Sequence, residues 1–187
     1  MFGRELTEQV RADARPNDKM VPLIVETCIS AVETSGESHS SGLANSRHWN
    51  WFRIALDHEG IYRKNGGNSQ SKLITQLFER GDYSTFDLLD SERFNDVSSI
   101  TSVLKSYFRT LPNPLLTFVL HDEFMFASSI RDPIHKSAKY ADLVKQLPTE
   151  HYYTLRALMF HLHRFVAPTH HTIYIFGKPS LTCDLHS

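Results

Sequence analysis

Hydrophobic residues recur every three to four positions along most of the chain, the spacing that gathers them on one face of a helix. One such run begins at Pro22 and continues to Val32; proline suits a first helical turn because it lacks the N–H that would stay unbonded there. Another helix is expected between Asn68, which can cap its start, and Gly81, which ends it. The buried face of this second helix is predicted to be Leu73, Ile74, Leu77 and Phe78.

The second half of the chain continues the helical spacing in four segments. The first starts near Asp96 and stops before Pro112, which cannot continue a helix. Three more are expected at about 118–129, 133–146 and 149–166. The last has an apolar face made of Tyr152, Leu155, Leu158, Met159 and Leu162. Because no segment shows convincing strand alternation and 187 residues suit one domain, the pattern predicts a single all-α domain.

Residues 35–54 break this pattern. They carry both tryptophans of the chain, Trp49 and Trp51, together with several serines, and they show no helical period. Large aromatic side chains in such a stretch are exposed unless they find a surface to cover. We therefore expect a loop or insertion between the first predicted helix and the segment that follows.

Composition narrows the classes of function. The 20 Lys and Arg residues nearly balance the 21 Asp and Glu residues, so there is no overall basic field and no nucleic-acid partner is expected. No apolar run approaches the length of a membrane span, and the N-terminal residues show no signal-peptide pattern. Cys28 and Cys183 lie in unrelated contexts without a CxxC motif, which favours a reducing compartment and a cytoplasmic location.

Two sets of cations are candidates for chemistry. Arg63 lies in an irregular segment between Gly60 and Gly66, and glycines allow a tight loop to present a side chain away from the body of the protein. An arginine placed there can reach a phosphate with a planar fork of donors. Lys105 and Arg109 lie four residues apart on the polar side of the helix that starts near Asp96. Taken alone, both sets are more typical of solvated surface charges than of a functional site.

Two other kinds of site have weaker support. His161 and His163 have no acidic or thiolate partner at ligand spacing, so neither a metal site nor a cofactor is expected. Residues 66–72 offer a phosphate loop as an alternative. The glycine expected directly before Lys72 is absent there, and no hydrophobic strand precedes the segment.

Four blocks of the sequence resemble the Rho GTPase-activating protein (RhoGAP) domain family, in the order in which that family has them. Leu56-Asp57-His58-Glu59-Gly60-Ile61-Tyr62-Arg63-Lys64-Asn65-Gly66 resembles its arginine-finger loop. The other three blocks resemble its opening helix, its most recognisable helix with the turn that follows, and a later helix; they are Val21–Ile29, Asp96–Leu115 and Leu147–Arg164.

The resemblance implies a helical domain that binds a Rho-family GTPase in its GTP-bound state and accelerates GTP hydrolysis, without being an enzyme itself. It implies that Arg63 is the catalytic finger, that Gly60 and Gly66 belong to the finger loop, and that Lys105 and Arg109 brace the loop and face the GTPase. The alternative is a module of the same fold that docks GTPases or other proteins without stimulating hydrolysis.

Two segments depart from the family pattern. The pattern does not require residues 35–54, which we expect to be an insertion within a domain spanning 1–166. After Arg164 an asparagine that contacts the GTPase has no counterpart, and Phe176–Leu181 is only faintly similar to the family's Phe-Gly-Pro block. The chain therefore resembles a RhoGAP domain truncated at its C-terminal end, with incomplete final helices and an atypical tail over 167–187.

Overall fold

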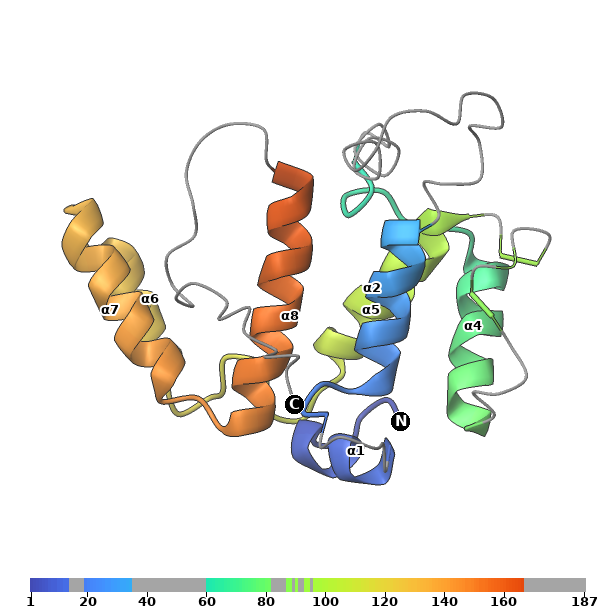
Figure 1. The fold of residues 1–187 in the computed structure, drawn as a ribbon, viewed down its shortest axis with the longest axis horizontal. Coiled ribbons are helices and arrows are strands. Elements are labelled where there is room, and N and C mark those ends of the chain that lie inside the picture. The colour runs from blue at the N-terminus through green and yellow to red at the C-terminus, as the bar shows by residue number, and fades with distance from the viewer. Residues whose placement is uncertain are drawn as a thin grey trace, which may run out of the picture.

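The computed structural model describes residues 1–13, 19–34, 60–81 and 96–166, with five single positions between 81 and 96. Every regular element in these ranges is a helix, so the all-α prediction is confirmed (Figure 1). The helices are α1 (Leu6–Asp13), α2 (Leu23–Thr34), α4 (Asn68–Arg80), α5 (Val97–Arg109), α6 (His121–Ser129), α7 (Pro133–Lys145) and α8 (Thr149–Val166). The predictions about residues 35–54 and 167–187 lie outside the described part of the chain.

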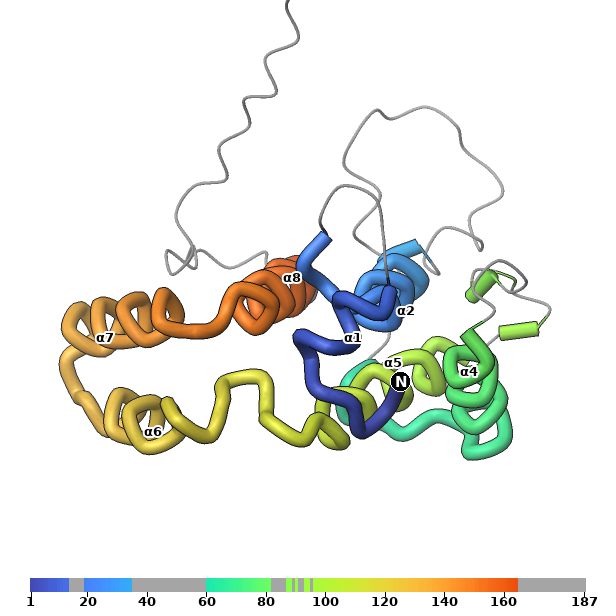
Figure 2. The backbone as a smooth tube through the Cα atoms, turned by 90° about the horizontal axis from the view of Figure 1, so that it is seen from below, coloured from blue at the N-terminus to red at the C-terminus, as the bar shows by residue number. Residues whose placement is uncertain are grey.

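The helices form two rows. Figure 2 shows α7, α8 and α2 in one row and α6, α5 and α4 in the other. The α6–α7 pair lies at one end of the molecule, and α1 lies beneath the N-terminal starts of α2 and α8 (Figure 1). Helix α5 packs against both α2 and α4, so it occupies the centre of the larger part of the fold.

The main hydrophobic core lies among α2, α4 and α5. It contains Ile24, Val25, Cys28 and Val32 from α2, Ile74 and Phe78 from α4, and Ile100, Val103, Leu104 and Tyr107 from α5. The predicted faces of these helices are therefore mostly correct. Leu73 is the exception, because it is 36% exposed. A smaller core joins α6, α7 and the start of α8 through Leu120, Ala127, Leu143 and Leu147, with Tyr152 and Leu155 packed against it.

At the helix ends, two of the predicted start and stop signals are confirmed and one is wrong. Asp96 caps α5 by accepting a hydrogen bond from the Ser98 N–H, and Gly81 ends α4 in a left-handed conformation with φ 72°. The predicted cap at Asn68 is wrong, because α4 starts at Asn68 itself and Gly67 occupies the cap position without a side-chain bond. The Gly67 N–H instead donates to Asp96 Oδ2 (2.9 Å), so α5 fixes the entry to α4.

Three further details differ from the sequence-based expectations. Helix α1 was not expected, since its sequence is charged and buries only Leu6 and Gln9. Helix α6 begins at His121 rather than near 118. The apolar face expected for α8 is only half-buried, whereas three polar residues of that helix, His151, Thr154 and His161, are buried.

Candidate functional site

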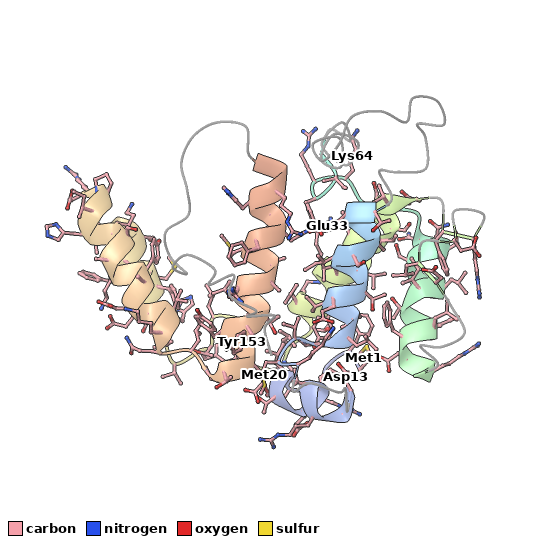
Figure 3. The ribbon with its side chains drawn as sticks, viewed as in Figure 1. Met1, Asp13, Met20, Glu33, Lys64 and Tyr153 are labelled. Atoms are coloured by element: carbon pink, nitrogen blue, oxygen red, sulfur yellow. The ribbon has the colours of Figure 1, made fainter. Side chains whose placement is uncertain are left out.

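Residues 60–67, the arginine loop, lie at the end of the molecule where α2 and α8 end (Figure 1). The loop opens with a tight turn in which the N–H groups of Arg63 and Lys64 both donate to the carbonyl of Gly60 (2.8 Å each). Gly60 has φ +77°, a conformation that strains residues with a Cβ. Arg63 and Lys64 are both exposed, and Figure 3 shows Lys64 at the same end of the molecule as Glu33. The turn therefore presents a cation pair to solvent.

Side chains of α5 hold the main chain of this turn. Thr101 Oγ1 donates to the carbonyl of Ile61 (2.9 Å). Lys105 Nζ donates to the carbonyl of Tyr62 (3.0 Å) and to that of Lys64 (3.3 Å). The two carbonyls that Lys105 contacts flank Arg63, so the ammonium group fixes the backbone on both sides of the arginine.

Gly66 brings the end of the loop directly against α5. Its N–H donates to Ser102 Oγ (3.0 Å). A Cβ added at Gly66 would lie 2.1 Å from the nitrogen and 2.3 Å from the Cα of Ser99, both of which are helix backbone atoms that cannot swing aside. Glycine is therefore needed at this position for close approach, not for a positive φ, which within the loop occurs at Gly60.

The next residue, Gly67, is bonded to the capping group of α5. Its N–H donates to Asp96 Oδ2, which also accepts from Ser99 Oγ (2.5 Å). Burial alone would raise the pKa of Asp96, but hydrogen bonds from Ser99, Gly67 and Ser98 outweigh it and lower the pKa. Since the N–H groups of Gly66 and Gly67 are both bonded within the domain, they are not available to cradle a phosphate, and the phosphate-loop alternative loses its basis.

A second anchor of the loop comes from α8. The hydroxyl of Tyr62 is hydrogen-bonded to Nε2 of His161, and the two rings meet edge to face. Nδ1 of His161 is bonded to a carboxylate oxygen of Glu33 in α2 (2.8 Å), and Arg164 pairs with the same carboxylate. The residue before Arg63 is thus held at its carbonyl by α5 and at its hydroxyl by α8.

The pKa shifts of Glu33 and Tyr62 indicate where the protons of this network lie. Burial alone would raise the pKa of Glu33, but hydrogen bonds from His161 and Arg164 outweigh it and lower the pKa. An ionised carboxylate only accepts, so Nδ1 of His161 carries a proton and donates to Glu33. Burial raises the pKa of the Tyr62 phenol, with smaller contributions from Cys28 and Glu33, so the hydroxyl that bonds to Nε2 keeps its proton.

A polar groove of about 630 Å³ runs beside the loop, between α4 and α5. Its described lining includes Lys72, Lys105 and Arg109 but no carboxylate. Lys105 is half-buried and reaches the loop, while Arg109 is exposed one helical turn further on. The groove and the exposed Arg63 together form a cationic surface suited to an acidic or phosphate-bearing partner.

The structure thus places the sequence-predicted residues in the arginine loop or in the groove beside it; they are Gly60, Arg63, Gly66, Lys105 and Arg109. Sequence reasoning missed Lys72 as a lining residue of the groove. It also missed the anchoring residues Glu33, Tyr62 and His161, whose type and spacing carry no signal of their contact. A single hint was available: His161 is a polar residue within an otherwise apolar helical run.

Two negative findings concern only the described residues. Among them, no three His, Cys, Asp or Glu side chains come close enough together to hold a metal ion. None of the described helices combines the length and the apolar character needed to cross a bilayer.

Comparison with known proteins gives consistent results. A family model described as "RhoGAP domain" matches residues 52–173. Rho GTPase-activating protein 21 of Xenopus tropicalis is 33% identical over 156 residues, which are 82% of this chain and 7% of that protein. Probable Rho-type GTPase-activating protein 2 of Schizosaccharomyces pombe is 31% identical over 167 residues, which are 89% of this chain and 12% of that protein.

The fold has a solved counterpart. The crystal structure of human Rho GTPase activating protein 15 superposes with a TM-score of 0.71 at 25% identity, covering 88% of this chain and 66% of that one. The chain spans only a small fraction of the two sequence relatives, so the likeness concerns their shared domain. Because the family model covers well over half of the sequence, the chain belongs to the RhoGAP domain family.

Proposed function

We propose that this chain stimulates GTP hydrolysis by a Rho-family GTPase in its GTP-bound state, as part of signal transduction. Arg63 enters the partner's active site as an arginine finger. The chain supplies a catalytic group in trans and is not itself the GTPase. The observation that carries the proposal is the exposed Arg63 on a turn whose flanking carbonyls are both held by Lys105, beside a cationic groove.

The physical basis is charge stabilisation. Negative charge spreads over the phosphoryl oxygens in the transition state of GTP hydrolysis, and a positioned guanidinium meets it. Arginine fingers of this kind are worth about 10³–10⁵ in rate, or about 4–7 kcal/mol of activation free energy. Such a gain requires a group whose position is set before the reaction. The bonds from Thr101 and Lys105 to the loop's carbonyls supply that order.

The groove accounts for partner binding. Lys72 and Arg109 extend the positive surface from the loop along α4 and α5. Charge complementarity of this kind orients an encounter and raises the association rate more than it raises affinity. We assign Lys105 both tasks, since it lines the groove and holds the loop. A cytoplasmic location is part of the proposal; among the described residues Cys28 is a free, buried thiol.

Docking without stimulation is the second candidate function, because the cations Lys72 and Arg109 lie apart from Arg63 and can bind a partner independently of it. A panel of GTP-loaded Rho-family GTPases separates the two. Single-turnover GTP hydrolysis and binding are measured across a titration with the chain. Acceleration that saturates with the chain supports the proposed function. Binding without acceleration selects docking, and neither effect with any GTPase of the panel overturns both.

A further inference from the structure

Tyr62 is the residue through which two helices fix the base of the proposed finger. It precedes Arg63 directly, so their Cα atoms are about 3.8 Å apart and any rotation at Tyr62 redirects Arg63. Its carbonyl accepts from Lys105 of α5, and its hydroxyl bonds to His161 of α8. The bond from Lys105 fixes the backbone of Tyr62, and the bond to His161 fixes the far end of its side chain.

His161 is itself held in one orientation. Its side chain is buried, and Nδ1 is fixed by Glu33, which also pairs with Arg164. The bond at Nδ1 therefore sets the ring so that Nε2 faces the Tyr62 hydroxyl. Glu33, Tyr62 and His161 come from α2, the arginine loop and α8, so the link joins three separate parts of the chain.

From this geometry we infer that His161, oriented by Glu33, is a positioning residue for the finger, acting through the hydroxyl of Tyr62. The inference rests on the proposed function, since it assigns the network a task in that reaction. It adds that the rate of hydrolysis depends on α8 as well as on α5. It also predicts a separable effect: losing the link disorders Arg63 without altering the cationic groove that binds the partner.

The decisive variant is Tyr62→Phe, which removes one hydroxyl and keeps the ring. The maximal single-turnover rate at saturating chain should fall about three- to tenfold, the amount expected for one neutral hydrogen bond. The chain concentration giving half of that rate should stay unchanged, because Lys72 and Arg109 are untouched. A fall in affinity at an unchanged maximal rate would overturn the inference.

A double-variant comparison tests whether the two residues act as one unit. His161→Leu should lower the maximal rate at least as much as Tyr62→Phe, and the combination should be no slower than His161→Leu alone. Independent, multiplying effects would contradict a shared link. Glu33→Gln keeps an acceptor for His161 and should retain more of the maximal rate than Glu33→Ala. If His161→Leu does not fold, Tyr62→Phe and the Glu33 pair decide.

His151→Leu is the matched control for a merely structural role. His151 is a buried histidine of the same helix, and its Nδ1 bonds to the carbonyl of Leu115 (3.0 Å), away from the arginine loop. This variant should lower thermal stability and leave the maximal rate unchanged. If it slows hydrolysis as much as His161→Leu does, the effect is general destabilisation and the inference fails.

The experiment also separates failure of this inference from failure of the proposed function. If the wild-type chain accelerates no Rho-family GTPase, both fall together. If the wild-type chain accelerates hydrolysis and Arg63→Ala does not, while Tyr62→Phe keeps the wild-type maximal rate, the inference alone falls.

Discussion

Replacing Gly66 by alanine should detach the arginine loop from α5, whereas the same change at the neighbouring Gly67 should be harmless. The added Cβ at position 66 would lie 2.1 Å from the Ser99 nitrogen. Unstrained contacts start at about 3.5 Å, so the loop must move by about 1.4 Å. That shift carries the Gly66 N–H beyond hydrogen-bonding distance of Ser102, which it now contacts at 3.0 Å.

The magnitude follows from two contributions. Forcing one methyl group into a packed site costs about 1–3 kcal/mol, and the lost hydrogen bond adds about 1 kcal/mol. The free energy of unfolding should therefore fall by about 2–4 kcal/mol, which for a chain of this size lowers Tm by about 4–16 °C. At Gly67 the nearest atoms to an added Cβ are 3.9 Å away, and φ −60°, ψ 128° suits any residue. Gly67→Ala should stay within about 1 kcal/mol of the wild type.

Urea unfolding followed by far-ultraviolet circular dichroism measures both variants under the same conditions. We expect a clear loss of stability for Gly66→Ala and little change for Gly67→Ala. If the two variants unfold within about 0.5 kcal/mol of each other, the close approach of the loop to α5 is refuted.

Three further predictions concern other contacts of the loop and the groove. Lys105→Met removes the hydrogen bonds to both carbonyls that flank Arg63. Because hydrogen bonds from a charged donor are worth about 1.5–3 kcal/mol each, the maximal single-turnover rate should fall at least about tenfold. An unchanged rate would show that the ammonium group does not order the turn. Arg109→Ala should weaken partner binding and reduce the dependence of binding on salt, while the maximal rate is kept. Fluorescence titrations at two ionic strengths measure this. Equal salt dependence of the wild type and the variant would argue against the groove as the binding surface. Asp96→Ala should lower the free energy of unfolding by about 1–2 kcal/mol at neutral pH, because the helix cap is lost. Since the folded state lowers the pKa of Asp96, this difference should be present above about pH 4 and shrink as the pH falls below it. A difference that grows on acidification would contradict the direction of the pKa shift.

Local signals in the sequence were enough for most of the fold. The spacing of apolar residues located α2, α4, α5, α7 and α8, and Asp96, Gly81 and Pro112 marked where helices start or stop. Helix α1 was missed because a short, charged helix that buries only Leu6 and Gln9 leaves almost no period to detect. Asn68 failed as a cap because a contact 29 residues away, from Gly67 to Asp96, fixes the chain there instead.

For the candidate site too, local patterns in the sequence predict some residues, and only the fold reveals the others. Its outer residues, Arg63 and the Lys105–Arg109 pair, could be named from the sequence because a glycine-flanked arginine and a helical cation pair are local patterns. The anchoring residues could not, since Tyr62 and His161 are 99 positions apart and His161 and Glu33 are 128 apart. Only the packing of α8 beside α2 brings them together.

The central claim is that Arg63 supplies positive charge to the transition state in a partner's active site. It is tested most directly by the maximal single-turnover rate of GTP hydrolysis by a Rho-family GTPase saturated with the wild-type chain, Arg63→Ala, Arg63→Lys or Lys64→Ala. Lys64 is the matched control, as a neighbouring exposed cation of the same turn. The account predicts a loss of about 10³-fold or more for Arg63→Ala, little rescue by lysine, and a nearly unchanged rate for Lys64→Ala. Acceleration by Arg63→Ala equal to that of the wild type would contradict it.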